Sequence, residues 1–151
     1  MRHAGLPGVI LPVPPGWEDR SQLIIVSGEG ADFRANIVVV KEELKDRSLE
    51  EFIDQHIGTL RGTFDGFSLQ LEEPASFGPH RGHLIDYGFV AAGKSYRQRQ
   101  FMVVAQGLVY TFTYSNTAAD FDPGLALLEQ VVGNTQIVSQ QRGADVFTGM
   151  G

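Results

Sequence analysis

Two histidines three residues apart, His80 and His83, come nearest in this sequence to the residue types and spacing of a metal site. Such a site needs a third ligand and a second shell that orients the imidazoles. The chain has no cysteine to supply that ligand, and Pro79 with glycines on either side predicts an exposed loop. A metal or hydrolytic enzyme built on these two histidines is therefore the weakest of three functional hypotheses.

Other arrangements that could do chemistry are incomplete. His56 falls on the apolar row of a predicted helix, where a hydrogen-bonded, partly buried histidine is commoner than a catalytic base. The run from Ser27 to Gly30 lacks the Lys-Ser/Thr pair and the helix start that hold a phosphate. Asp86 lies in a predicted strand, where it can pair with Arg97 or Arg99 across a ladder. We therefore expect no catalytic residues, no cofactor and no metal.

Size and charge exclude several classes of protein. The chain has 151 residues, 42% of them apolar, a net charge of −6 and no cysteine. This length supports one domain with its own core and no disulfides. Nucleic-acid binding is a poor fit because phosphate contacts need clustered cations, and the acidic sequence has no basic stretch.

No segment of the sequence resembles a membrane span or an export signal. The longest aliphatic runs, 37–40 and 101–105, are far shorter than the roughly 20 residues that cross a bilayer. Near the N-terminus the only apolar run, 9–11, is flanked by Pro7 and Pro12 and is too short for a signal peptide. We expect a bacterial cytoplasmic protein that is not itself inserted in a membrane.

The secondary-structure pattern predicts an α+β domain. Ser48 and Glu51 form a capping box that starts a helix, whose apolar rows stop near Gly62 and Gly66. A second helix is predicted over 121–132. Strands are predicted at 23–26, 36–41, 67–72, 83–91, 95–105, 108–115 and 135–138, with a loop at Pro74, Gly78 and Pro79. Short glycine-containing connections make 83–115 an antiparallel meander. The expected architecture is one mostly antiparallel, twisted sheet of about six strands with two main helices.

Three predicted strands are apolar on both faces. The runs 24–26, 37–40 and 101–104 do not alternate with polar residues, as they would in a sheet with one wet face. Two helices could lie on one face or be divided between both, and either arrangement leaves little cover for six strands. A partner subunit or a bound apolar ligand could supply the remaining cover.

The strand from Tyr96 to Met102 carries two glutamines on one face. By the two-residue period, Gln98 and Gln100 share that face with Tyr96 and Met102. One interpretation is an ordinary solvated strand end. The other is a binding face, on which amides exchange hydrogen bonds with polar groups of a guest inside an apolar groove.

An ordered series of short matches resembles a known family. It covers about residues 9 to 138 and includes Leu11-Pro12, Gly16 to Ser21, Asn36 to Val39, Ser48 to Phe52, Asp65 to Phe67, Gly82, Asp86-Tyr87, Arg99 to Phe101 and Tyr110 to Thr113. These residues resemble the DcrB-related domain, and within it they are most similar to the Eag chaperones of bacterial type VI secretion. His56 departs from the polar amide that is usual in those relatives.

The resemblance implies a PsbP-like α+β sandwich and a non-enzymatic, cytoplasmic homodimer. It also implies a function: shielding the hydrophobic N-terminal transmembrane helices of an effector, often of the Rhs type, before loading onto the secretion spike. The implied domain spans 9–138, between a flexible N-terminus (1–8) and a flexible tail (139–151). The second hypothesis is a PsbP-like binding or assembly module that recognises a soluble protein or a small ligand.

The parity of the predicted strands, with the helix row beside them, selects candidate residues for the effector-helix-binding face. They are Ile24, Val38, Leu60, Phe64, Tyr96, Gln100 and Met102. The alternative for each residue is a place in the core. Trp17 is interpreted as an aromatic residue pinned at the sheet end, and Asp19 and Tyr87 as hydrogen-bonding partners of the backbone.

Overall fold

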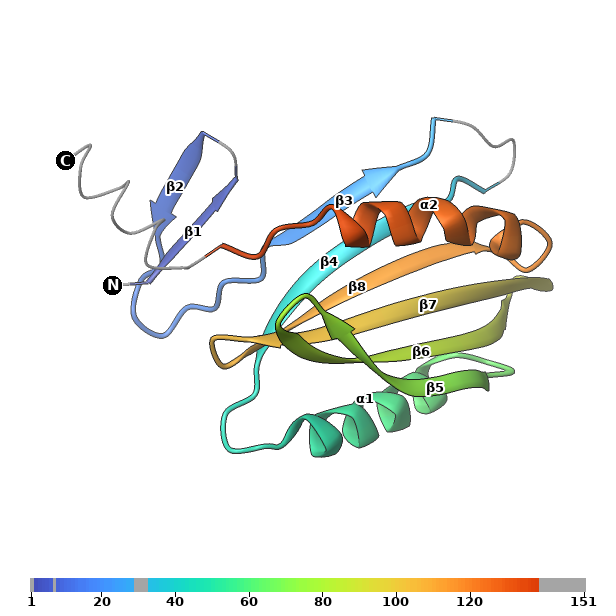
Figure 1. Cartoon of the computed structure of the whole chain (residues 1–151), viewed down its shortest axis with the longest axis horizontal. Helices are drawn as coiled ribbons and strands as arrows, with labels where there is room; N and C mark the ends of the chain where they lie inside the picture. The colour runs from blue at the N-terminus through green and yellow to red at the C-terminus, as the bar shows by residue number, and fades with distance from the viewer. Residues whose placement is uncertain (1, 7, 29–32, 139–151) are drawn as a thin grey trace.

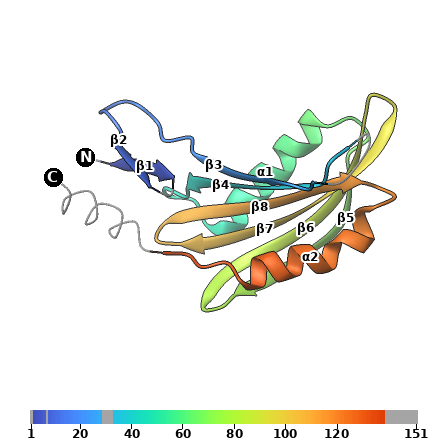
Figure 2. The same cartoon turned by 90° about the horizontal axis from the view of Figure 1, so that it is seen from above.

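A six-stranded antiparallel sheet forms the centre of the protein, with one helix on each side (Figures 1 and 2). The computed structural model describes residues 2–6, 8–28 and 33–138. The elements are β1 (His3–Leu6), β2 (Val9–Pro12), β3 (Gln22–Val26), β4 (Asn36–Glu43), α1 (Leu49–Thr63), β5 (Ser68–Phe77), β6 (His80–Ala91), β7 (Lys94–Ala105), β8 (Leu108–Thr117) and α2 (Phe121–Gly133). The strand order is β3-β4-β8-β7-β6-β5, so β3 and β5 are the edges. The predicted α+β class and six-stranded sheet are confirmed.

The meander from β6 to β8 folds through two tight turns. Ala92 and Gly93 join β6 to β7, and Gln106 and Gly107 join β7 to β8, all four with positive φ. Two-residue turns of this hand match the twist of antiparallel strands. They fix the register that places Gln100 opposite Ile85 on β6 and Thr113 on β8.

Helix α1 begins at the predicted cap and covers only part of one sheet face. The Ser48 hydroxyl accepts a hydrogen bond from the Glu51 amide, at 3.1 Å. Phe52, Ile53 and Leu60 of α1 are buried against Ile85 and other residues of β5, β6 and β7, and against the start of β8, next to the β7–β8 turn. We refer to this as the α1 side of the sheet. Strands β3 and β4 lie beyond the reach of α1 on this side (Figure 1).

Helix α2 packs on the opposite side, so the helices are divided between the two faces (Figure 2). Phe121, Leu128 and Val132 are buried against Phe112 and Tyr114 of β8 and their neighbours. Leu125 and Val131 of the same helix are only partly buried. Each helix therefore closes its own core cluster, and the sheet separates the two clusters.

Strand β5 is longer than the sequence predicts. Pro74 lies inside it, paired with His83, rather than in a loop. A proline is tolerated there because β5 is an edge strand. The N–H that proline lacks would point away from the neighbouring strand, so no ladder hydrogen bond is lost. The turn falls at Gly78 and Pro79, which makes His80 and His83 part of β6. The prediction of an exposed loop around these histidines is therefore wrong.

Two further sequence predictions differ from the structure. Residues 135–138 follow α2 without forming a strand. Residues 135–138 pair with neither of the edge strands, β3 and β5. Trp17 is 69% exposed, so it is not pinned at the sheet end. Asp19 does bind the backbone, accepting from the Ser21 amide at 2.9 Å and from Lys41 at 2.6 Å.

The N-terminal segment forms a separate hairpin. Strands β1 and β2 pair only with each other among the described residues, and the Val13 amide donates to the Arg2 carbonyl at 2.7 Å. The domain boundary expected at residue 9 falls at the start of β2, inside this hairpin. The tail expected over 139–151 lies outside the described residues. Within the described ranges, no helix has the length and apolarity to cross a membrane.

Candidate binding groove

The part of the α1 side that α1 does not reach is a groove floor made by β3, β4 and the end of β8 from Thr113 onward, because Val109 at the other end of β8 is buried under α1. Directly opposed residues of antiparallel strands share a face. Ile24 is paired with Val38, Val38 with Thr113, and Thr113 with Gln100. Val26, Asn36 and Ser115 form the adjacent row. We call this surface the β3–β8 groove. Its floor runs from aliphatic side chains at the edge to hydroxyl and amide groups at the centre.

A polar relay connects α1 with the groove floor. His56 Nε2 and Gln100 Oε1 are 2.7 Å apart, and Gln100 Nε2 donates to Thr113 Oγ1 at 3.0 Å. Because the Gln100 amide nitrogen donates to Thr113, its oxygen accepts from His56. Gln100 is buried under α1, while Thr113 faces the groove. The relay holds the amide rigidly and ends at a hydroxyl that keeps its own proton as a donor.

A second relay runs parallel to the first, one row along the strands. The Tyr87 hydroxyl donates to Gln98 Oε1, and Gln98 Nε2 donates to Ser115 Oγ at 2.8 Å. Tyr87 is fully buried, and that burial raises the pKa of its phenol. Both relays therefore present a hydroxyl of β8 at the groove, held from behind by a buried or partly buried amide.

Aromatic rings form one end of the groove. Tyr96 lies 5.1 Å from Phe33 and 5.7 Å from Phe89, measured between ring centroids. Phe64 of the α1 C-cap stacks on Phe89 at 4.2 Å. A cavity of about 520 Å³ is lined by the rings of Phe33, Phe89 and Tyr96, by the turn residue Ala92 and by the strand residues Asn36, Val38, Ala91, Gln98, Thr113 and Ser115. The cavity of the groove therefore lies at its aromatic end.

The seven sequence-predicted residues separate into three groups. Val38 and Tyr96 line the cavity, and Ile24 lies beside Val38 at the open edge, 57% exposed. Phe64 and Gln100 lie behind the groove, in the aromatic wall and in the first relay. Leu60 and Met102 are buried in the core between α1 and the sheet. The structure therefore brings Ile24, Val38 and Tyr96 together on one surface.

Sequence reasoning missed the contribution of β8. Thr111, Thr113 and Ser115 alternate along this strand and place three hydroxyls on the α1 side. The alternation was visible in the sequence, but the pairing of β8 between β4 and β7 was not. Without that order, Thr113 could not be placed between Val38 and Gln100.

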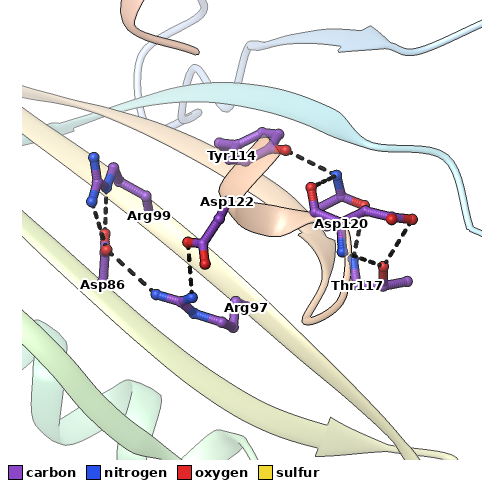
Figure 3. A network of polar contacts seen from close by, with 8 residues as sticks. Asp86, Arg97, Arg99, Tyr114, Thr117, Asp120 and Asp122 are labelled. Atoms are coloured by element: carbon purple, nitrogen blue, oxygen red, sulfur yellow. Dashed lines mark hydrogen bonds and ion pairs between the residues drawn. The ribbon is translucent and has the colours of Figure 1, made fainter. Parts of the chain in front are cut away.

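On the opposite face, a buried ion-pair network connects β6, β7 and α2 (Figure 3). Arg99 donates twice to Asp86, at 2.5 and 2.7 Å, which raises the pKa of the Arg99 guanidinium. Arg97 lies 3.8 Å from Asp86, 3.2 Å from Asp122 and over the Phe121 ring. The prediction that Asp86 pairs with Arg97 or Arg99 across the ladder is confirmed, and the structure places both arginines within ion-pair distance of it. The network positions α2 on β7 and is a structural feature of the fold.

The histidines considered first do not converge. His80 and His83 are three residues apart on β6, so their side chains point to opposite faces of the sheet. Across the described ranges, no three His, Asp or Glu side chains gather as metal ligands would. His80 instead lines a second cavity, of about 960 Å³, beyond the C-terminal end of α2, with Phe77, Leu84, Phe101, Val132 and Ile137.

The solved structures that are similar to this chain include the following three. The first is a Pseudomonas aeruginosa protein of unknown function, PA94, described as a putative regulator, with a TM-score of 0.82 and 19% identity over 92% of this chain and 98% of that one. The second is LpqN, involved in cell envelope biogenesis of Mycobacterium tuberculosis, with a TM-score of 0.56 and 16% identity over 83% and 79% of the two chains.

The third similar structure is the cyanobacterial PsbP (CyanoP) of Synechocystis, with a TM-score of 0.55 and 13% identity over 78% of this chain and 82% of that chain. The likeness shows a PsbP-like fold. No curated protein matches the sequence. A family model, DcrB, matches residues 10–133, which include the whole six-stranded sheet and both helices. The chain therefore belongs to the DcrB family.

Proposed function

We propose that this protein is a non-enzymatic chaperone and adaptor that holds an apolar transmembrane helix of a secreted effector in the β3–β8 groove. The effector class is the Rhs-type substrate of type VI secretion, and the protein acts in the bacterial cytoplasm before loading on the secretion spike. The observation that carries the proposal is a sheet face with exposed aliphatic side chains at its edge and relay-held hydroxyls at its centre.

The dimensions of the groove suit a helix. Three strands spaced about 4.8 Å apart give a floor roughly 14 Å wide, and a helix with its side chains is about 10–12 Å across. Strand β4 has eight residues, or about 27 Å, which is close to the roughly 30 Å of a 20-residue transmembrane helix. A helix can therefore lie along the strands beside α1.

The chemistry of the floor suits the same guest. A helix meant for lipid is apolar all round and aggregates in water unless its surface is covered. Ile24, Val26 and Val38 offer apolar contact, since Ile24 and Val26 are exposed and Val38 is partly exposed. Thr113 and Ser115 can donate to the small polar side chains that transmembrane helices use for packing. The proposal assigns no catalytic step to any residue.

Co-expression tests this function. An effector fragment that contains its transmembrane helices should be recovered in the soluble fraction only together with this protein. Ile24→Asp should abolish recovery because it places a charge on the groove floor. Leu127→Asp is the matched control, since Leu127 is 62% exposed on α2, on the other side of the sheet. A fragment equally soluble without the protein, or insoluble with it, refutes the proposal.

The second cavity favours a different candidate function, a binding or assembly module for a soluble protein or a small ligand. Its apolar lining includes Phe77 and Phe101, and Arg99 and Glu129 lie at the same cavity. Saturable binding of a soluble partner that Phe101→Ala abolishes and Ile24→Asp leaves unchanged would establish this module. The same pattern would separate it from the chaperone function.

A further inference from the structure

The second cavity lies on the α2 side of the sheet, between the hairpin of β5 and β6 and the C-terminal end of α2. The tip of the hairpin and this end of the helix lie side by side in both views (Figures 1 and 2). The cavity volume of about 960 Å³ is at the upper end of the range for ligand pockets, roughly 300–1,000 Å³. Its apolar lining includes Phe77, Leu84, Phe101 and Val132. The proposed chaperone function makes no use of this cavity.

The charged groups at this cavity leave an excess of negative charge. Glu73 of β5, Arg99 of β7 and Glu129 of α2 line it. Asp86 already accepts from two nitrogens of the Arg99 guanidinium, and the third, Nη1, lies 4.0 Å from Glu129. Within the described residues, Glu73 has no ion-pair partner closer than 4.0 Å. The guanidinium is therefore paired, whereas a carboxylate remains to be neutralised.

The C-terminal end of α2 adds negative potential at the same place. Helix α2 ends at Gly133, which lines the cavity beside Val132. A helix C-terminus carries a partial negative charge of roughly half an electron, which a basic residue in the last turn can balance. Helix α1 has Arg61 in its last turn, but α2 has no basic residue there. The helix end and the two glutamates therefore favour a positively charged ligand.

We propose that this cavity binds a small amphipathic amine, with its ammonium group at Glu73 and Glu129 and its apolar chain against Phe77 and Phe101. An ammonium group has three N–H donors. The two carboxylates can accept from it, and so can the imidazole of His80 when it is neutral, because all three residues line the cavity. Phe77 and Phe101 are partly buried and leave apolar surface for the chain. An anion of the same size would face both glutamates and find the guanidinium already paired. The site names the ligand class of the second candidate function, on which it rests, and is independent of the chaperone function.

Three probes with the same apolar chain and different head groups test the charge of the ligand. They are octylamine, which is protonated at pH 7, 1-octanol and octanoate. Calorimetric titration of the full chain should show saturable binding of octylamine, weaker binding of 1-octanol and no measurable binding of octanoate. Amide chemical shifts measured by NMR should change at Phe77, His80 and Phe101 rather than at Val38 and Thr113 of the β3–β8 groove.

Glutamine substitutions test the two carboxylates. Glu73→Gln and Glu129→Gln should each weaken octylamine binding about threefold, and the double variant should weaken it about tenfold. Glu72→Gln is the matched control, because Glu72 is the neighbour of Glu73 on β5 but lies opposite Ile85, on the α1 side. All three glutamates are exposed, so these variants should keep the fold, which circular dichroism checks.

Four outcomes overturn the proposal. They are no binding of octylamine, octanoate binding as tight as that of octylamine, an octylamine affinity that the double variant leaves unchanged, and shifts confined to the β3–β8 groove. None of these measurements uses the effector fragment, so they leave the test of the chaperone function untouched. A soluble partner whose binding Phe101→Ala abolishes would still support the second candidate function if octylamine does not bind, so the two failures are distinguishable.

Discussion

Gly124 shows how closely α2 approaches the sheet. A Cβ atom at this position would lie 1.8 Å from the Tyr114 hydroxyl and 2.8 Å from Cζ of the same ring. We predict that Gly124→Ala destabilises the protein by about 1–3 kcal/mol, because the helix must shift to relieve the overlap. Urea unfolding followed by circular dichroism measures the change.

The control for this prediction is a second helical glycine. Gly58 lies inside α1, and a Cβ atom there would meet nothing within 4 Å. Gly58→Ala should therefore stabilise the protein by about 0.5–1 kcal/mol through helix propensity alone. Equal effects of the two substitutions would show that Tyr114 does not determine the preference for glycine at position 124.

Asp19 ties the segment before β3 to β4. Partial burial opposes its ionisation, but hydrogen bonds from Lys41 and Ser21 outweigh burial, so the pKa of Asp19 is lowered. A lowered pKa means that the stabilisation is complete above the ordinary carboxyl pKa and is lost as pH falls through the folded-state value. Asp19→Asn should cost about 1–2 kcal/mol at pH 7 and much less in strong acid. Unfolding measured at both pH values checks this, and a cost independent of pH would contradict it.

At the scale of elements, the network in Figure 3 separates a buried ion pair from an exposed one. The Asp86 side chain is 4% exposed and faces two arginines, whereas Asp122 is 75% exposed. Asp86→Asn should cost about 3–5 kcal/mol, because Arg99 is left buried with uncompensated charge. Asp122→Asn should cost less than about 1 kcal/mol. Thermal unfolding of both variants measures the two losses of stability. Similar losses would contradict the prediction that the buried Asp86 matters more than the exposed Asp122.

The elements that could be predicted from the sequence were those with local signals. Ser48 and Glu51 mark the start of α1 by a hydrogen bond within one turn, and Gly93 and Gly107 mark hairpins by their positive φ. Pro74 misled the prediction because its effect depends on whether β5 is an edge strand, which only the assembled sheet determines. The loop predicted at His80 was wrong for the same reason, because β6 starts there only to pair with the extended β5.

The candidate site was partly predictable for the same reason. Parity within β7 correctly put Tyr96, Gln98 and Gln100 on one face, because the two-residue period is a local property. The separation of exposed Ile24 from buried Met102 could not be predicted. The exposure of each residue depends on how far α1 extends over the sheet, and this cannot be determined from the sequence of α1 alone.

At the scale of the whole molecule, the division of the helices between two faces explains where apolar surface remains. Strands β6 and β7 lie between both helices and are buried on both sides, which accounts for the non-alternating run 101–104. Strand β3 also has a non-alternating apolar run, but neither helix covers it and its side chains are exposed. The same sequence signal thus has two outcomes, a core at the centre of the sheet and an exposed surface at its edge.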